Sequence, residues 1–220
     1  VLIFEDREGH LWFSHLVSGG LSRFDPETVE LLTTQSVNLS LIQDRQKGFW
    51  FGNGAVLCHL QGQHLHRQTF NDVVFRILED SRGNLWVGTV RGDGLYRYAS
   101  PDAVWRGEGR RFTTADGLGS NDVYALLEGR DGTIWVGTAG HPACLCRFDG
   151  EVSSEARARS IGTFEAMPTP HRSFWHLFED RRGRIWMSDW SGSGLSCYDG
   201  ERSQVEQSEI PQGGGVPLRT

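Results

Sequence analysis

The sequence predicts an all-β chain, built as a β-propeller of about five four-stranded antiparallel blades. One segment, with at least one carboxylate, a glycine turn and a tryptophan, occurs five times along the 220 residues. Its tryptophans are separated by 38, 36, 49 and 51 residues: Trp12, Trp50, Trp86, Trp135 and Trp186. The surrounding apolar residues follow the period of strands, and the 3.6-residue period of helical repeats is not seen. A repeat of ~40–50 residues with four short strands is typical of a propeller blade.

Each copy is expected to hold the same four strands in the same order. The first strand is VFRILE (74–79) or VYALLE (123–128), and a tight turn with Gly83 or Gly132 follows it. The second strand carries the tryptophan, and the third is GLYRY, CLCRF or GLSCY. The fourth strand is less regular and is placed at 66–70, 110–114 and 205–210. The chain is therefore a single propeller segment with approximate blades at 1–37, 38–71, 72–121, 122–171 and 172–220.

The repeated side chains have structural explanations. The aspartate before the turn accepts turn N–H groups as an Asx-turn; its copies are Asp6, Asp44, Asp80 and Asp180. Gly129 replaces it in the fourth copy, so this turn is expected to be looser. Each tryptophan is expected to pack between neighbouring sheets, and the glycine after it allows close backbone approach. The recurring glutamates are interpreted as a repeat feature and not as general acids or bases: Glu79, Glu128 and Glu179.

Composition excludes several classes of function. The net charge of −6 argues against a nucleic-acid partner. No apolar run approaches the ~18–20 residues of a membrane span, so this segment is not expected to insert into a membrane. The four cysteines are expected to be small buried thiols, and Cys144 and Cys146 share a strand face without obvious partner ligands for a metal. His64 and His66 share a face of an outer strand. Their presence is explained equally well by an exposed edge strand and by a pair of metal ligands. No cofactor, metal site or catalytic residue is predicted.

The fullest copy is RRFTTADGLGSNDVYALLEGRDGTIWVGT, residues 110–138. It resembles the two-component regulator propeller repeat, whose pattern has a phenylalanine–threonine start, a Gly-Leu step, an asparagine, an acidic turn and a tryptophan before Gly-Thr. The matching residues are Phe112, Thr114, Gly117, Leu118, Asn121, Val123, Glu128, Gly132, Trp135, Gly137 and Thr138. The second copy departs from the pattern with GNGAVLCHL, and the fifth has MSDWSGSG where Gly-Thr is expected.

This resemblance implies a non-catalytic sensor module in the extracytoplasmic, or periplasmic, part of a bacterial signalling receptor. Such repeats typically form seven-bladed propellers, and some of the receptors recognise oligosaccharides. The implied partners are a small-molecule or oligosaccharide ligand, the remaining blades, downstream signalling domains and a dimer partner in the full-length receptor. Because Val1 lies directly on a first strand and PQGGGVPLRT resembles the start of another blade, an incomplete propeller is expected. Its first and last blades are expected to expose tryptophan-lined flanks and to associate.

Topology separates the two faces of such a propeller. The loops before the first strands and between the second and third strands lie on one face, the loop face, and they vary in sequence. The near-uniform turns between the first and second strands lie on the opposite, turn face. Variable loops carry function more often than uniform turns, so the loop face is the expected ligand face. The position four residues before the turn aspartate is expected to line the central channel: Leu2, Ser40, Arg76, Ala125 and His176.

The candidate ligand contacts follow from this placement. Arg76 and His176 suit an anionic or hydroxyl-rich ligand, and Trp175 and Trp190 offer stacking faces to a sugar. The complete set is Asp72, Arg76, Asp122, His171, Arg172, Trp175, His176 and Trp190. An alternative interpretation needs no ligand: the polar residues are solvated groups in the channel, and Trp175 is a core residue.

Two other functions stay open. One is a propeller enzyme of streptogramin-lyase type, with His176 or His171 as the base, and the other is a protein-interaction scaffold. Propellers host all three functions, so blades alone do not separate them. A stability expectation is independent of function: Trp135→Ala should cost roughly 3–5 kcal/mol, and the same change at Trp190, in a predicted loop, under about 1.

Overall fold

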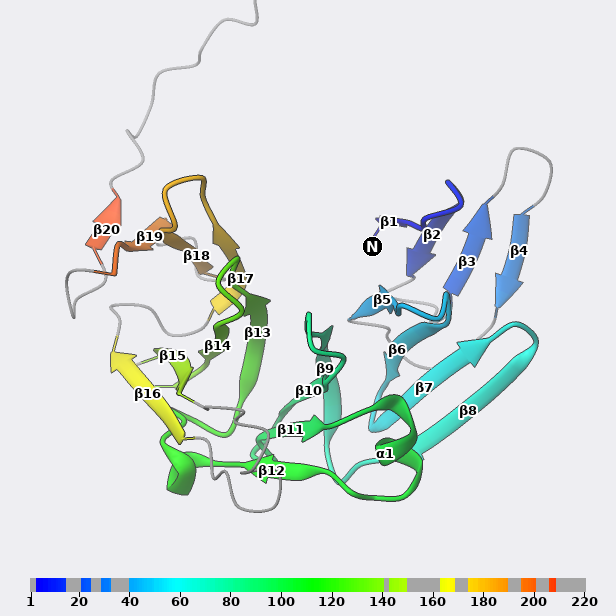
Figure 1. Ribbon diagram of the computed structural model, residues 1–220, viewed down its shortest axis with the longest axis horizontal. Coiled ribbons are helices and arrows are strands. Elements are labelled where there is room, and N and C mark those ends of the chain that lie inside the picture. Colours follow the sequence, from blue (N-terminus) through cyan, green and yellow to red (C-terminus); the bar gives the residue numbers. More distant parts are fainter. Residues whose placement is uncertain are drawn as a thin grey trace, which may run out of the picture.

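The described part of the chain forms five four-stranded antiparallel sheets that follow one another along an arc (Figure 1). The computed structural model describes residues 3–14, 21–24, 29–32, 40–140, 143–149, 163–168, 174–189, 195–200 and 206–208. Within these residues, helical structure is limited to α1 (Pro101–Trp105) and one 3-10 turn (Thr114–Asp116). The predicted all-β propeller of about five blades is confirmed.

In every sheet the strands pair in chain order, as the sequence predicted. The first sheet contains β1 (Ile3–Glu5), β2 (Leu11–Ser14), β3 (Leu21–Phe24) and β4 (Val29–Leu32). The second contains β5 (Leu41–Gln43), β6 (Phe49–Asn53), β7 (Val56–Gln61) and β8 (His64–Thr69). The third contains β9 (Val73–Glu79), β10 (Leu85–Val90), β11 (Leu95–Tyr98) and β12 (Arg110–Phe112). The fourth contains β13 (Val123–Glu128), β14 (Ile134–Thr138), β15 (Cys144–Asp149) and β16 (Thr163–Pro168). The fifth contains β17 (Phe174–Glu179), β18 (Ile185–Asp189), β19 (Leu195–Tyr198) and β20 (Glu206–Ser208).

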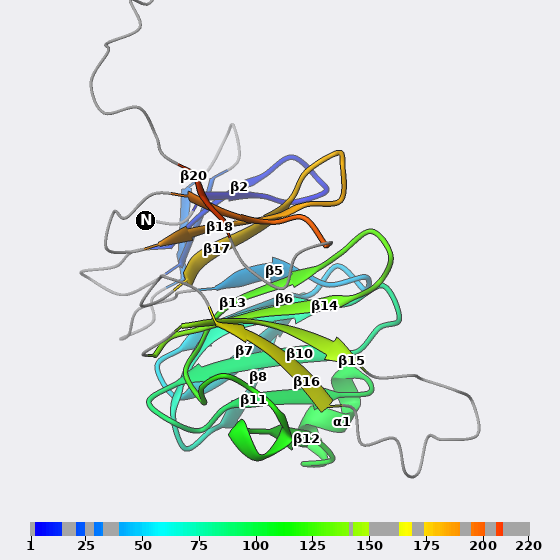
Figure 2. The ribbon, with the colours of Figure 1, turned by 90° about the vertical axis from the view of Figure 1, so that its left-hand side faces the viewer.

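The first strands of the sheets lie toward the inside of the arc and the fourth strands toward its outside (Figure 1). The hairpin turns β1–β2, β13–β14 and β17–β18 project on one side of the molecule, the right in Figure 2. This arrangement separates a turn face from a loop face, because an up-and-down sheet alternates the ends at which its strands are joined.

The turn aspartate organises both its turn and the tryptophan of the next strand. Asp80 Oδ1 accepts the N–H groups of Arg82 and Asn84 at 3.0 and 2.8 Å, which confirms the predicted Asx-turn. Its Oδ2 accepts the indole N–H of Trp86 at 2.8 Å, a link that the sequence analysis did not predict. Asp6, Asp44 and Asp180 bind Trp12, Trp50 and Trp186 in the same way. The indole of Trp186, together with Arg184, lowers the pKa of Asp180 far below its usual value.

The turn of the fourth sheet is not looser than the others, contrary to expectation. Gly129 N–H donates to Thr133 O at 2.8 Å, and Gly132 N–H donates to Gly129 O at 2.9 Å. The third sheet makes the same pair of backbone bonds, both at 2.9 Å. Asp131 Oδ1 accepts the N–H of Thr133 at 2.9 Å, so a carboxylate two residues later replaces the missing one. The backbone and not the aspartate sets the shape of this turn.

Each described joint between sheets is a hydrophobic cluster with a repeat tryptophan in it. Trp50 packs with Val74 and Ile77 of the third sheet, and Trp86 packs with Val123 and Ile134 of the fourth. Trp135 packs with Phe174, Ile185 and Met187 of the fifth, and Trp12 packs with Phe49 of the second. The prediction that these tryptophans fill the spaces between sheets is confirmed, and each one faces the sheet that follows it.

This direction corrects one expectation about the ends of the arc. Trp12 is buried against the second sheet, so the outer flank of the first sheet is lined by Ile3 and Phe24 and not by tryptophan. On the fifth sheet Trp186 is only half-buried, in contrast to the buried tryptophans of the other sheets.

Candidate functional site

Three aromatic residues lie at equivalent irregularities in the first strands of the third, fourth and fifth sheets. Where β9, β13 and β17 pair with their second strands, the register skips Phe75, Tyr124 and Trp175. An extra residue of this kind is a β-bulge, which re-aims a side chain relative to its neighbours. The Phe75 ring lies 4.7 Å from the Tyr124 ring and 5.7 Å from the Trp175 ring, centroid to centroid. The bulges therefore bring aromatic side chains of three sheets together on the inner strands.

Arg76 links the third and fifth sheets at this aromatic group. Its Nη2 donates to the backbone oxygen of Trp175 at 3.0 Å, although the two residues are 99 positions apart. Its Nη1 donates to Phe75 O at 3.1 Å, and its guanidinium carbon lies 4.6 Å from the Phe75 ring centroid and 5.5 Å from that of Trp175. Burial lowers the pKa of Arg76 to about 10, so it remains a cation at neutral pH. Such a cation between two ring faces gains cation–π attraction.

His176 completes the group and remains accessible. Its side chain is exposed, and burial together with the positive charge of Arg76 lowers its pKa below the usual value. The imidazole is therefore neutral at pH 7 and offers one donor and one acceptor. The structure thus brings three predicted site residues together from two sheets: Arg76, Trp175 and His176. We call these three residues, with Phe75 and Tyr124, the channel cluster.

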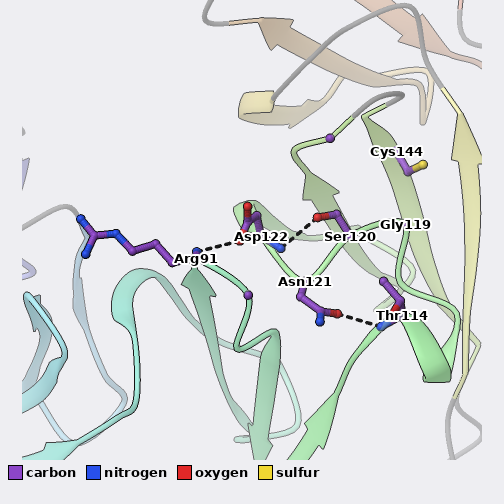
Figure 3. A pocket seen from close by; sticks show the side chains of 9 residues that line it. Arg91, Thr114, Gly119, Ser120, Asn121, Asp122 and Cys144 are labelled. Carbon is purple, nitrogen blue, oxygen red and sulfur yellow. Dashed lines mark hydrogen bonds between the residues drawn. The ribbon is translucent and has the colours of Figure 1, made fainter.

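Asp122 lies on the loop face, in a cleft between the third and fourth sheets (Figure 3). The cleft has a volume of about 630 Å³. Its lining residues come from the β10–β11 loop, the segment before β13, the β14–β15 loop and the start of β15: Arg91, Gly92, Thr114, Gly119, Ser120, Asn121, Asp122, Gly140 and Cys144. Asp122 was predicted from the sequence, whereas the cleft around it was not.

Hydrogen bonds fix the walls of this cleft. Asp122 Oδ1 accepts the N–H of Arg91 at 2.7 Å, and Arg91 has a φ of 84°, a left-handed conformation that is uncommon for a non-glycine residue. Asn121 Oδ1 accepts the N–H of Thr114 at 2.8 Å, and Ser120 Oγ accepts the N–H of Asp122 at 3.2 Å. Figure 3 shows the Arg91 side chain extending away from Asp122. The cleft therefore offers hydroxyl, amide and carboxylate groups, which suit a hydroxyl-bearing ligand.

The other predicted positions have simpler surroundings. Asp72 Oδ1 accepts the N–H of Val73 at 2.7 Å, a local bond at the start of β9. Ser40 and Ala125, predicted to line the channel, are buried. His171, Arg172, Trp190 and Leu2 lie outside the described residues.

The sequence also offers Cys144 with Cys146, and His64 with His66, as pairs of candidate metal ligands. None of the four cysteines forms a disulfide, and three of them are buried. His64 and His66 are exposed on β8. In the described ranges, no set of three or more His, Cys, Asp or Glu side chains is arranged to hold a metal ion.

Residues 69–91 and 117–140 match the family model of the two component regulator propeller. These two segments are similar to two component regulator propeller repeats. The matched segments include Phe75, Arg76 and Tyr124 of the channel cluster and much of the cleft, with Arg91, Gly119 and Asp122. No curated protein sequence matches the chain. None of the helices in the described part has the length and apolarity that a membrane span requires.

Solved structures with a similar fold include the extracellular domain of a one component system and two enzymes. The extracellular domain of BT4673 from B. thetaiotaomicron, described as a one component system, superposes with a TM-score of 0.74 at 22% identity. The match covers 94% of this chain but only 27% of that one. A catalytically inactive virginiamycin B lyase from Staphylococcus aureus gives a TM-score of 0.73 at 13% identity, over 96% of this chain and 69% of the lyase. A gluconolactonase from Xanthomonas campestris gives 0.63 at 15% identity, over 90% of this chain and 70% of that one. At these identities the comparisons show the propeller fold.

Proposed function

We propose that this propeller segment is a non-catalytic ligand-sensing module of a bacterial signalling receptor, located outside the cytoplasm. The two segments that match the two component regulator propeller and the likeness to the extracellular domain of a one component system support this proposal. Its proposed partners are further propeller blades and signalling domains of the receptor, together with a ligand on the loop face. The observation that carries the ligand proposal is the meeting of Arg76, Trp175 and His176 from two sheets.

The chemistry of the channel cluster favours a hydroxyl-rich ligand with a negative charge, such as an acidic oligosaccharide. Arginine forms paired, charge-assisted hydrogen bonds with carboxylates. Aromatic rings give an apolar surface for the C–H face of a sugar ring, and neutral His176 donates and accepts hydrogen bonds with hydroxyl groups. Ligand sites typically combine an aromatic lining with a few polar groups. The cleft beside Asp122 adds hydroxyl and amide groups on the loop face, without a described aromatic side chain in its lining.

Calorimetric titration with oligosaccharides of galacturonic acid and of glucose tests this function. We expect binding of the acidic series to weaken by about tenfold or more in His176→Ala and Arg76→Gln, a loss of about 1.4 kcal/mol. His176 is exposed, so its truncation should leave the fold intact, whereas thermal melts must accompany Arg76→Gln because Arg76 also joins two sheets. Arg82→Gln, on the turn face, is the matched control and should bind like the parent chain.

Two outcomes contradict the proposal. One is that neither series binds, and the other is that binding is unchanged in both His176→Ala and Arg76→Gln. Binding that Arg82→Gln weakens as much as Arg76→Gln does would place the ligand on the turn face.

A further inference from the structure

Three consecutive residues of the cleft wall each spend one side-chain oxygen on a backbone N–H group. Ser120 Oγ accepts from Asp122, Asn121 Oδ1 from Thr114 and Asp122 Oδ1 from Arg91. One polar group of each wall residue then remains for a ligand: the hydroxyl hydrogen of Ser120, the amide NH₂ of Asn121 and the second carboxylate oxygen of Asp122. Among the described residues, none of these three groups has a hydrogen-bond partner.

The opposite side of the cleft is held in a strained conformation. Arg91 has a φ of 84°, and Gly92 follows it with a φ of 108°. The loop is fixed to the fourth sheet at two points, because Arg91 N–H donates to Asp122 and Gly94 N–H donates to the backbone oxygen of Asn121 at 3.0 Å. A non-glycine residue keeps such a φ where its surroundings impose it, and this kind of strain concentrates at ligand sites. The cleft is therefore shaped before a ligand arrives.

The preceding joint shows which part of the cleft the repeat explains. Asn71-Asp72 comes before β9 as Asn121-Asp122 comes before β13. Asp72 Oδ1 accepts the N–H of its own neighbour, Val73, and makes no bond to the second sheet. The loop on that side, between β6 and β7, has two residues, whereas the loop between β10 and β11 has four. The longer loop turns a repeated Asn-Asp pair into the wall of a cleft.

The chemistry of this wall favours an uncharged, hydroxyl-bearing group. Within the described ranges Asp122 forms no ion pair, and the Arg91 side chain extends away from it (Figure 3). A hydroxyl group can donate to the Asp122 carboxylate and accept from Ser120 or Asn121. A carboxylate in the same place would face Asp122, and like charges brought together oppose binding. The wall is thus selective against a second acidic group.

The cleft is adjacent to the channel cluster. Asp122 precedes Tyr124 of that cluster by two residues, which places their Cα atoms about 7 Å apart along the start of β13. That separation is comparable to the length of one sugar unit. The cleft volume of about 630 Å³ lies in the range of pockets that bury small ligands. A saccharide chain with one unit at the channel cluster can therefore place its next unit in the cleft.

We propose that the cleft is a subsite for an uncharged sugar unit, next to an acidic unit at the channel cluster. The proposal rests on the proposed function and narrows its ligand class to oligosaccharides in which acidic and neutral units are adjacent. The Asp122 carboxylate accepts a hydroxyl hydrogen of the neutral unit, while Ser120 and Asn121 donate to its oxygens. Arg76 binds the acidic unit, so the two sites read opposite charges on neighbouring units.

Three disaccharides of one linkage and one carbon skeleton test this subsite: glucosyl-glucose, glucuronosyl-glucose and glucuronosyl-glucuronic acid. In calorimetric titrations we expect the mixed disaccharide to bind about tenfold more tightly than either of the other two.

Asp122→Asn keeps an oxygen for the Arg91 N–H but replaces the ligand-facing carboxylate oxygen by NH₂. It should weaken binding of the mixed disaccharide by about tenfold and abolish the preference over the all-acidic one, with an unchanged melting temperature. Asp102→Asn removes the same charge at an exposed position of α1, outside the cleft lining, and is the matched control.

The outcomes separate this subsite from the proposed function. If the galacturonic acid series binds through Arg76 and His176 but the mixed disaccharide binds no more tightly than the all-acidic one, the proposed function stands and the subsite is overturned. A preference that survives Asp122→Asn also overturns it, because the wall then does not read the neutral unit. If no acidic saccharide binds, the proposed function fails and the subsite fails with it.

Discussion

Replacing Trp135 by alanine lowers the free energy of unfolding by roughly 3–5 kcal/mol, the range for removal of a buried large aromatic side chain. Trp135 lies in the cluster between the fourth and fifth sheets, with Phe174, Ile185 and Met187. Its ring centroid is 5.4 Å from that of Tyr198 in the next sheet. The substitution leaves a cavity in a joint whose strands on both sides are fixed by backbone pairing, so the space cannot close easily.

Trp186→Ala is the matched control, because Trp186 holds the same repeat position in the last sheet. It is half-buried and has no described following sheet against it, although it still donates to Asp180 at 2.9 Å. We expect it to cost less than half as much as Trp135→Ala. Denaturant melts followed by circular dichroism measure both. Equal losses would show that the tryptophans stabilise their own turns and not the joints between sheets.

Gly52→Val is expected to destabilise by about 3 kcal/mol, the upper part of the usual range for overpacking. A Cβ atom at Gly52 would lie 2.6 Å from the backbone oxygen of Val74 in the third sheet. That oxygen belongs to a paired strand, β9, and cannot move without shifting the joint. The glycine after the tryptophan is therefore required by the approach of the next sheet.

Ser188→Val in the last sheet tests the same reasoning in the opposite direction. Ser188 occupies the position of Gly52, Gly88 and Gly137, and its strand has no described sheet after it. We expect a change within about 0.5 kcal/mol, as for most substitutions away from packed features. If both valines cost the same in denaturant melts, local strand effects and not the contact between sheets explain the glycines.

The features that the sequence predicted are those that recur within one blade. The turn aspartate, the glycine at positive φ and the tryptophan act over a few residues, so their spacing alone indicates four strands and a joint. The register Trp86↔Leu78 and Trp86↔Arg97 across three strands follows from that local pattern. The expectation that Gly129 makes its turn looser was wrong, because Asp131 supplies a carboxylate from a position that the other copies do not use.

The features that the sequence did not predict depend on contacts between blades. The bulges at Phe75, Tyr124 and Trp175 shift the side-chain alternation by one residue, and only pairing with the second strand shows them. The hydrogen bond from the Arg130 N–H to the Glu179 side chain joins residues 49 positions apart. The repeated glutamate was therefore recognised from the sequence, whereas its contact with the preceding sheet was not.

In the candidate site, too, individual residues were predicted from the sequence, whereas their contacts between blades were not. Arg76 and His176 were identified from their place four residues before the turn aspartate, and Trp175 was identified as a stacking face. That Arg76 meets Trp175, 99 positions further along the chain, could be seen only in the folded structure. The cleft was represented by Asp122 alone. The loop GLGSND supplies Gly119, Ser120 and Asn121 to it, and small polar residues in that loop were a usable signal.

The central claim is that the loop face and channel cluster bind the ligand while the turn face holds the sheets together. Hydrogen–deuterium exchange, with and without the tightest-binding oligosaccharide of the titration series, tests this most directly. We expect slower exchange in residues 91–94, 114–122 and 174–177, and no change in the turns at 80–84 and 180–184. Protection confined to those turns, with the loop face unchanged, would contradict the claim.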